Sequence, residues 1–346
     1  MSRSVQTRRV AWVVAGVAVM VWRSGFGSFP DTPLFARVIV PALPSLPRLA
    51  PQAQYVLSSP IGAVVASLFR ATSEASFDLV HIGVFIGFVV AVGVLVVRRD
   101  GFGPAALVGA GFVGSQTSVI LLAWIGSYDV FTVGLTSMLV VVRRWWAMAM
   151  IGFLLAFAAF EQGLIIIGML LVLSAFGMFD RWRGLLWALG GSAIGRILLQ
   201  VWLRANDATH GRLWFLRSAG LEELLGQFWR SLPWLIPTAL GATVVALVVA
   251  LASEPRWRDR IVVIVLLVAC LVPVAVSLDQ SRVYAVLSWP IVMVVLLRYA
   301  RRSDRREIAG LSMITLGLSA IVPGVFVWEA RAQLARHHLA RVLLNR

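Results

Sequence analysis

The sequence predicts an all-α protein, a polytopic bundle of transmembrane helices that forms a single integral membrane domain over residues 1–346. Three observations support this prediction. Hydrophobic residues make up 60% of the chain, charged residues only 14%, and the mean hydropathy is +0.87, unlike a soluble domain. Apolar runs long enough to cross a bilayer recur along the chain. Short clusters of arginine separate many of these runs, as topology signals do.

We expect about eleven spans, within a range of roughly ten to twelve. The first span follows a basic head, and because no small-x-small cleavage site comes after it, we expect a retained helix and not a removed signal peptide. The apolar piece 55–69 is instead expected to be an interfacial or re-entrant helix. The expected spans are residues 9–24, 77–97, 103–126, 130–142, 145–160, 163–179, 184–203, 233–253, 261–277, 284–299 and 309–328.

Arginine placement orients the expected bundle, since cytoplasmic connections carry the excess of arginine. With the N-terminus inside, the short inner connections hold clusters such as Arg98-Arg99 and Arg143-Arg144. The outer side then has two long loops, residues 23–76 and 204–232, and a basic C-terminal tail, residues 329–346. Arginine without lysine, in a chain rich in Ala, Val and Gly, is typical of a GC-rich bacterial genome. We therefore expect a multi-pass protein of the bacterial cytoplasmic membrane that works at its outer face.

This orientation places four acidic residues at the outer ends of spans: Asp31, Asp129, Glu161 and Asp279. Asp129 is expected either to cap the helix that follows it or to hold a sugar hydroxyl or a metal at the membrane surface. Glu161 belongs either to a plain turn or to a polar cavity, because an ionisable residue is costly in lipid. Asp31, the one carboxylate between residues 23 and 55, is either a turn residue or a general base.

The late outer loop combines a possible membrane-surface helix with basic side chains. Residues 220–232 have apolar side chains at helical spacing, which predicts a helix lying on the membrane. His210, Arg212 and Arg217 precede or begin this segment. They belong either to a solvated loop or to a site for a lipid-linked phosphate or pyrophosphate, for which the planar fork of arginine is suited.

Asp279 and Arg282 stand three residues apart at the start of a late span, so their side chains can pair on one helix face. One interpretation is a helix cap with a neutralising salt bridge. The other is one wall of an outer-face site, with Arg282 contacting phosphate and Asp279 orienting it.

Several kinds of site are not indicated. The chain has no phosphate-binding Gly-rich loop, no dinucleotide turn, no Gly-x-Ser-x-Gly elbow and no His/Cys metal cluster. The basic residues do not form a stripe on a soluble domain, so we expect no nucleic-acid partner. The single Cys270 cannot form an internal disulfide. Membrane lipids are the expected environment.

The order of these features resembles the GT-C class of polytopic glycosyltransferases. The shared pattern is a long first outer loop, a surface Asp after an early span, an acid between two short mid-chain spans and a late outer loop. The segment Asp279-Gln-Ser-Arg-Val-Tyr-Ala-Val is also similar to an Asp-x-Ser/Thr-Arg-Val-aromatic run of related bacterial membrane proteins. The first loop lacks the paired acids of many members, which leaves the need for a divalent metal open.

The resemblance implies a reaction in which a sugar passes from a polyprenyl-phosphate carrier to a glycan, lipid or protein acceptor. Asp31 would be the general base and Asp129 a second catalytic carboxylate. Arg282, Arg212 and His210 would stabilise the departing phosphate. Glu161 and Asp279 would bind the substrate or orient those cations.

Two other functions stay open from the sequence. A transporter or flippase of a lipid-linked substrate would carry charges within spans, and Arg196, inside the span expected at 184–203, favours it. A non-catalytic membrane assembly protein would tolerate replacement of the outer acids.

Overall fold

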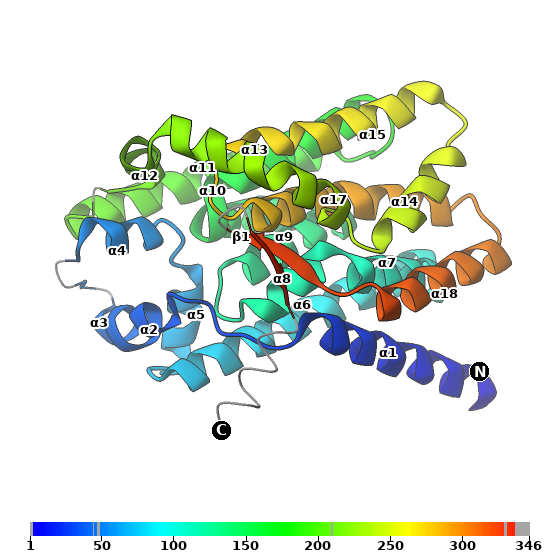
Figure 1. The fold of residues 1–346 in the computed structure, drawn as a ribbon, viewed down its shortest axis with the longest axis horizontal. Coiled ribbons are helices and arrows are strands. Elements are labelled where there is room, and N and C mark those ends of the chain that lie inside the picture. Colours follow the sequence, from blue (N-terminus) through cyan, green and yellow to red (C-terminus); the bar gives the residue numbers. More distant parts are fainter. Residues whose placement is uncertain (1–2, 44, 47–48, 209, 329–330, 336–346) are drawn as a thin grey trace.

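The computed structural model describes residues 3–43, 45–46, 49–208, 210–328 and 331–335. It is a bundle of helices with one small hairpin of two strands, and the short helices α2 to α5 and α12 gather at one end of it (Figure 1). Four helices, α6, α10, α11 and α17, are long and apolar enough to cross a membrane, and α7 with α8 forms a further, bent candidate. The predicted helical, multi-pass membrane fold is confirmed.

The elements are bounded as follows. The helices are α1 Arg3–Ser24, α2 Thr32–Leu34, the π-helical turn η1 Phe35–Ile39, α3 Val40–Ala42, α4 Pro51–Val56, α5 Ile61–Leu68, α6 Glu74–Asp100, α7 Phe102–Gly114, α8 Gln116–Ala123, α9 Asp129–Val141, α10 Trp145–Ala175, α11 Trp182–Ala205, α12 Arg212–Ala219, α13 Leu221–Thr238, α14 Thr243–Ala252, α15 Trp257–Ala269, α16 Leu271–Ala275, α17 Gln280–Ala300 and α18 Arg305–Ile321. The strands are β1 Val325–Trp328 and β2 Arg331–Leu334.

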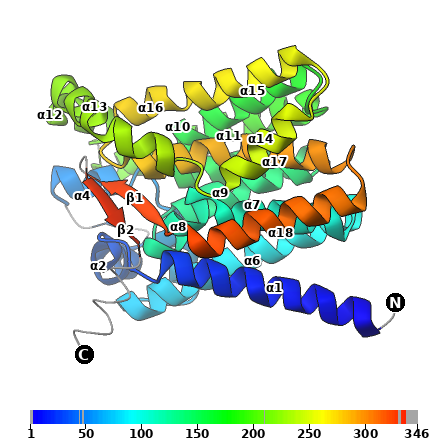
Figure 2. The same cartoon turned by 45° about the vertical axis from the view of Figure 1, so that its right-hand side comes forward.

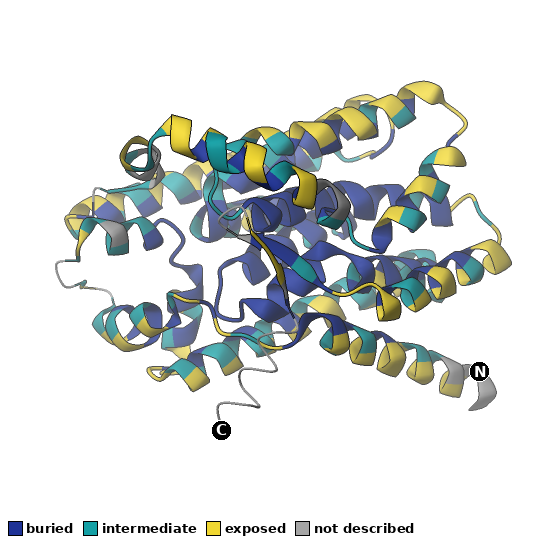
Figure 3. Cartoon of the chain, in the orientation of Figure 1, coloured by how far each residue is buried: buried dark blue, intermediate teal, exposed yellow. Residues whose placement is uncertain are grey.

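Helix α17 is the centre of the bundle. Its most apolar stretch is 94% buried inside the protein, whereas that of α6 is only 11% buried (Figure 3). Helices α7, α8, α9, α10 and α14 all pack against α17. The apolar outer faces of helices such as α6 and α11 are left for lipid, because the bundle itself does not cover them.

The long helix α10 is two helical arms that fold back on each other at Ala159, where the backbone is not helical (φ −158°, ψ 85°). In a straight helix Met148 and Met178 would lie about 45 Å apart, yet both line one cavity. Leu155 also packs against Gly163 across the turn. The two spans expected at 145–160 and 163–179 therefore correspond to the two arms.

Several expected spans are broken in the structure. The span 103–126 bends by 62° between α7 and α8, where the Ser115 side chain caps the second helix by accepting from the Ser118 amide. The span 233–253 divides between α13 and α14, and 261–277 divides at Cys270. The prediction that 309–328 is one helix was wrong at its end, because α18 stops at Ile321 and β1 follows.

The hairpin of β1 and β2 contributes to the core beside the start of α17. Its strands are antiparallel, with Val325 opposite Leu334. The Val327 amide donates to the Ser281 hydroxyl at 2.9 Å, and this hydroxyl lies on the first turn of α17. Residues 331–335 of the expected basic tail are thus part of the fold, and residues 336–346 lie outside the described part of the chain.

The bundle has two ends, and Figure 2 shows the short helices α2, α4 and α12 at one end and the N-terminus of α1 at the other. We call the end that holds Asp31, Asp129, Asp279 and Arg282 the site end. The opposite end, where α6, α9 and α17 finish, we call the arginine end. It holds Arg99, Arg143, Arg181 and Arg301. Asp31, Asp129 and Asp279 thus lie at the end opposite these arginines, although other acids, such as Asp100 and Glu254, lie at the arginine end. Which end faces the cell exterior stays a prediction.

Candidate functional site

The site is built around Arg282 on the first turn of α17, whose side chain is only 8% exposed. Its Nη2 atom donates to Asp279 Oδ2 at 2.6 Å, and its Nη1 atom lies 3.3 Å from Asp129 Oδ2 and from the Tyr128 hydroxyl. Two carboxylates from different helices therefore hold one guanidinium. A buried arginine needs such partners, since an unpaired buried charge costs several kcal/mol, on the order of 3–5 when one partner is removed.

Two aromatic rings also hold Arg282. The guanidinium carbon lies 5.4 Å from the Trp124 ring centre and 5.3 Å from that of Tyr128. A cation near an aromatic face is attracted by the ring quadrupole, most strongly where water is excluded. Even so, the Arg282 Nε–H and the Asp129 Oδ1 atom are buried without a hydrogen-bond partner. The cluster therefore keeps one unused donor and one unused acceptor.

Asp129 is not the helix cap that one interpretation expected. It is fully buried and is the first residue of α9, and Tyr128 occupies the capping position without a side-chain bond to the helix. The Asp129 carboxylate instead accepts from the Ser127 hydroxyl at 2.8 Å and faces Arg282. Asp279 does occupy the capping position of α17, but its side chain makes no capping bond and pairs with Arg282 as the i, i+3 spacing predicted.

Asp31 precedes the short helix α2 and makes no capping bond to it. Burial raises the pKa of the Asp31 carboxyl, the positive charge of Arg282 lowers it, and the negative charge of Asp279 raises it again, so that the pKa lies above the ordinary value. Asp31 is therefore near enough to Arg282 and Asp279 for their charges to act on it. The structure thus brings Asp31 to the Arg282 cluster.

A tight turn at Gly126 explains how the first loop reaches this cluster. Gly126 has a φ of +94°, and a Cβ there would lie 2.5 Å from Thr32 Oγ1 and 2.9 Å from Asp78 Oδ1. Only glycine fits both the backbone angle and the space. Phe29 and Ile125 are joined by a backbone hydrogen bond of 2.7 Å beside this turn. The loop and the start of α9 are thereby held together.

Sequence analysis missed three residues of the site: Trp124, Tyr128 and Asp78. Trp124 and Tyr128 both precede Asp129 by only a few residues, so aromatic residues close to the predicted acids were a usable signal. Asp78 lies in the first turns of α6 and had no such signal, because its neighbours Thr32 and Gly126 are distant in sequence. Its Oδ1 atom is buried without a hydrogen-bond partner.

Glu161 lies in the turn between the arms of α10, as the sequence predicted. Its carboxylate is 3.3 Å from Arg196 Nη2 of α11, and the Arg196 guanidinium also lies 4.8 Å from the Phe160 ring centre. Arg196 lies within α11 and is paired there with Glu161, while its Nη1 atom is buried without a hydrogen-bond partner. The transporter alternative that Arg196 favoured therefore stays open, and the predicted role of Glu161 in binding substrate stays a prediction.

The two long loops meet at the site end, around His210. His210 Nδ1 is 2.9 Å from Gln54 Oε1 of α4, and the Leu46 amide donates to Asn206 Oδ1 at 3.0 Å. Tyr55, next to Gln54, is close enough for its hydroxyl to act on the Arg282 charge. A cavity of about 410 Å³ lies between these loops.

Two expectations concern the segment that follows His210. Arg212 begins α12, and its side chain lies outside the described part of the structure. The surface helix expected at 220–232 is the start of α13, which continues to Thr238.

The described side chains do not fit a metal centre. Across the described residues, no three His, Cys, Asp or Glu side chains gather to hold a metal ion. One carboxylate oxygen of Asp129 and one of Asp279 pair with Arg282, so the positive partner of both carboxylates is the guanidinium.

No protein-family model and no curated protein matches the chain. Two solved structures do, both crystal structures of ArnT from Cupriavidus metallidurans, one bound to undecaprenyl phosphate and one in the apo state. Each has a TM-score of 0.58 and 15% sequence identity to this chain. The chain has the fold of ArnT.

The match covers 90% of this chain for the undecaprenyl phosphate complex and 89% for the apo structure. It covers only 62% of the ArnT chain in each case, so this protein spans less than two thirds of the structure it resembles. ArnT is a GT-C glycosyltransferase, and the expected GT-C-like membrane fold is thereby confirmed. At 15% identity the likeness shows the fold alone.

Proposed function

We propose that the protein is a membrane glycosyltransferase that transfers a sugar from a polyprenyl-phosphate carrier to a cell-envelope glycan, lipid or protein. The observation that supports this most is the buried Arg282, held by Asp129 and Asp279 beside Asp31, within a fold shared with ArnT. The ArnT structure bound to undecaprenyl phosphate supports the carrier class. The donor sugar and the acceptor are left unassigned.

In the proposed reaction Asp31 is the general base. Its raised pKa makes the carboxylate a better proton acceptor than an ordinary aspartate. Asp31 takes the proton of the acceptor hydroxyl as that oxygen bonds to the anomeric carbon of the sugar. The bond from this carbon to the phosphate oxygen breaks at the same time, and its electron pair leaves with polyprenyl phosphate. A single displacement of this kind inverts the anomeric configuration.

Arg282 supports this reaction mainly by orienting groups. Two carboxylates pair with the guanidinium and a third, Asp31, is near enough for its charge to act on it, so the cluster has little positive charge to spare for a phosphate. The Asp129 and Asp279 carboxylates suit sugar or acceptor hydroxyls, which donate hydrogen bonds. The departing phosphate then needs cations from beside the cluster. His210 and Arg212, on the loop that packs against α4, are our candidates.

The proposal is tested by incubating membranes that contain the protein with a panel of synthetic polyprenyl-phosphate hexoses and pentoses. Release of polyprenyl phosphate is then measured. We expect one donor to be consumed by the wild-type protein, and Asp31→Asn to reduce the rate by about 10²- to 10⁴-fold, the usual contribution of a general base. Glu222→Gln replaces an exposed acid at the start of α13 and is the matched control.

Two results would contradict the proposal. One is a wild-type protein that consumes no donor while moving the intact lipid-linked sugar between leaflets, which indicates a transporter. The other is an Asp31→Asn variant that restores the envelope glycans of a deletion strain as fully as Glu222→Gln, which indicates an assembly protein.

A further inference from the structure

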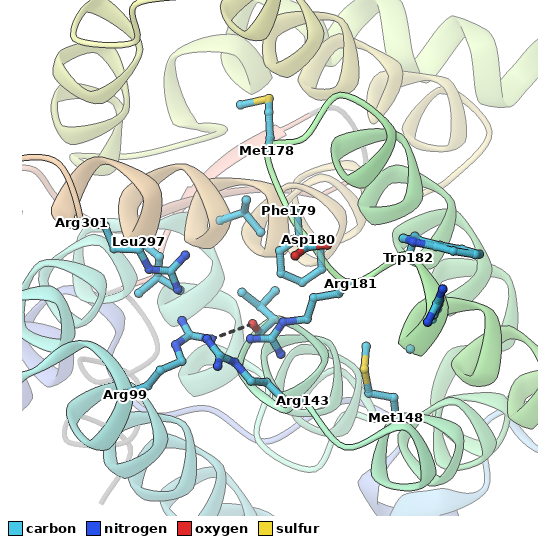
Figure 4. A pocket seen from close by; sticks show the side chains of 14 residues that line it. Arg99, Arg143, Met148, Met178, Phe179, Asp180, Arg181, Trp182, Leu297 and Arg301 are labelled. Atoms are coloured by element: carbon cyan, nitrogen blue, oxygen red, sulfur yellow. Dashed lines mark hydrogen bonds between the residues drawn. The ribbon is translucent and has the colours of Figure 1, made fainter.

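A second cavity, of about 580 Å³, lies at the arginine end, the far end of the bundle from Arg282 (Figure 4). The end of α6, the connection from α9 to α10, the connection from α10 to α11 and the end of α17 line it. Figure 4 shows arginine side chains entering it from separate elements. The lining includes five arginines: Arg99, Arg143, Arg181, Arg183 and Arg301.

Acidic side chains do not balance this charge. Asp180 is the one acid of the lining, and Asp100, just outside it, pairs with Arg99 and Arg301. Among the ion pairs between described residues, Arg143 and Arg183 have no acidic partner. The cavity therefore keeps a positive charge that a bound anion would offset.

Arg181 is held in place at the centre of this group. Its Nη1 atom donates to the Val142 carbonyl, which anchors the guanidinium between the connections. Burial lowers the pKa of Arg181 to about 10, and the neighbouring positive charges of Arg99, Arg143 and Arg301 add to this lowering. Mutual repulsion within the group is thus appreciable, and an anion among the guanidinium groups would relieve it.

Two helices direct their positive ends toward the same cavity. Helix α10 begins at Trp145 and α11 at Trp182, and both beginnings adjoin lining residues. Neither helix has an acid in its first turn or a side-chain cap on its first amides. Uncapped amides at a helix N-terminus favour anions, and phosphate in particular.

Exposed tryptophans lie at the starts of the two helices that adjoin the cavity, and Trp182 is part of its lining. Trp145, Trp146, Trp182 and Trp187 are each exposed by more than half. Tryptophan gathers at the depth of the lipid headgroups, where its ring is in apolar surroundings and its N–H meets water. An anion in this cavity would lie at the same depth as the phosphates of the surrounding leaflet.

We propose that the arginine end is a phosphate-binding site, separate from the Arg282 cluster, that takes the phosphate headgroup of an anionic lipid. Arg143 and Arg183 contact the phosphate, and Arg181 with Arg99 positions them around it. This inference does not depend on the proposed glycosyl transfer. The competing explanation is the general excess of arginine on the cytoplasmic side of membrane proteins. That excess requires positive charge at this end but no particular position for each arginine.

The test uses the full-length protein in detergent and compares Arg143→Gln with Arg144→Gln. These adjacent positions contribute equally to the charge of this end, but only Arg143 lines the cavity. Native mass spectrometry measures retention of phosphatidylglycerol and, as a zwitterionic comparison, phosphatidylcholine. A second arm measures the thermal unfolding midpoint as inorganic phosphate is added.

We expect phosphatidylglycerol to bind the wild-type protein and Arg144→Gln equally, and Arg143→Gln about tenfold more weakly. If inorganic phosphate stabilises the protein and phosphatidylglycerol is not retained, the lipid assignment is overturned and a soluble phosphate is the ligand. If Arg143→Gln and Arg144→Gln retain phosphatidylglycerol equally and are stabilised equally by inorganic phosphate, the proposed site is overturned. Arg183→Gln takes the place of Arg143→Gln if that variant fails to fold.

Discussion

The two ends of α17 each hold an arginine between two carboxylates, and the two clusters differ in how fully they are bonded. At the arginine end, Arg298 donates twice to Glu254, at 2.9 and 3.0 Å, and once to Asp259 at 2.5 Å. Its remaining Nη1 atom donates to the Gly177 carbonyl. Every nitrogen of this guanidinium is used.

At the site end, Arg282 makes only single contacts with its two carboxylates, and its Nε–H and one Asp129 oxygen are left without a partner. Buried polar groups are ordinarily bonded, because leaving one unpaired costs about 1–3 kcal/mol. A saturated cluster such as that of Arg298 serves stability. An unsaturated cluster in the same helix is better explained by a ligand that completes it.

The largest expected effect distinguishes the two arginines by activity. Arg282→Lys keeps the charge but loses the fork that spans Asp129 and Asp279, so we expect transfer to fall by about 10²- to 10³-fold. Arg298→Lys should leave the rate per folded molecule unchanged. Both are measured as polyprenyl phosphate released per molecule that elutes as folded protein in size-exclusion chromatography. Equal losses would remove the distinction between the clusters.

The converse experiment measures stability. Arg298→Gln leaves Asp259 without this arginine, while Arg302 still pairs with Glu254 at 2.7 Å. We expect the free energy of unfolding to fall by about 3 kcal/mol, the lower end for breaking a buried ion pair. Denaturant titration in detergent measures this. A variant as stable as the wild type would show that the Arg298 cluster is no more structural than that of Arg282.

Two glycines with positive φ sharpen the comparison, Gly126 at the site end and Gly177 at the arginine end. Gly126→Ala combines backbone strain with a clash against Thr32 and Asp78, and we expect a loss of about 2–3 kcal/mol together with reduced transfer. Gly177 has a φ of +70° but open space around it, so Gly177→Ala should cost only about 1 kcal/mol and leave transfer intact. Unfolding midpoints and rates of the two variants check both statements.

The smallest effects are those of pH, and they have opposite signs at the two ends. Asp31 has a raised pKa, so transfer should decline as pH falls through a value above the ordinary aspartate pKa of about 3.9. The folded protein should correspondingly lose a little stability as pH rises through that same value, because ionised Asp31 is disfavoured by burial. Rate and unfolding profiles of the wild type and Asp31→Asn test this. The profiles coincide if Asp31 does not titrate.

Glu254 behaves in the reverse manner. Burial raises the pKa of its carboxyl, but hydrogen bonds from Arg302 and Arg298 outweigh burial and leave the pKa below the ordinary value. Its stabilising effect is therefore complete above the unfolded pKa of about 4.3 and is lost as pH falls through the folded one. Glu254→Gln should remove this part of the acid dependence. An unchanged acid dependence would contradict the assignment.

The sequence alone determined those features that depend only on residues close together in the chain. Apolar length predicted the spans, including the two arms of α10 with Glu161 at their turn, because burial in lipid depends on each segment alone. The i, i+3 spacing of Asp279 and Arg282 predicted their pair, because a helix sets that distance by itself. Clusters of arginine predicted which ends of the spans lie together.

Only the tertiary structure decided which partners meet across the chain. Asp129 and Arg282 are 153 residues apart, and Arg298 reaches Glu254 and Asp259 from another helix. The spacing of residues along the sequence does not reveal such a pairing, because the pairing depends on how α9, α14 and α17 pack. The same packing decided that Asp129 faces Arg282 and does not cap its helix, that α18 gives way to a hairpin beside Ser281, and that scattered arginines surround one cavity.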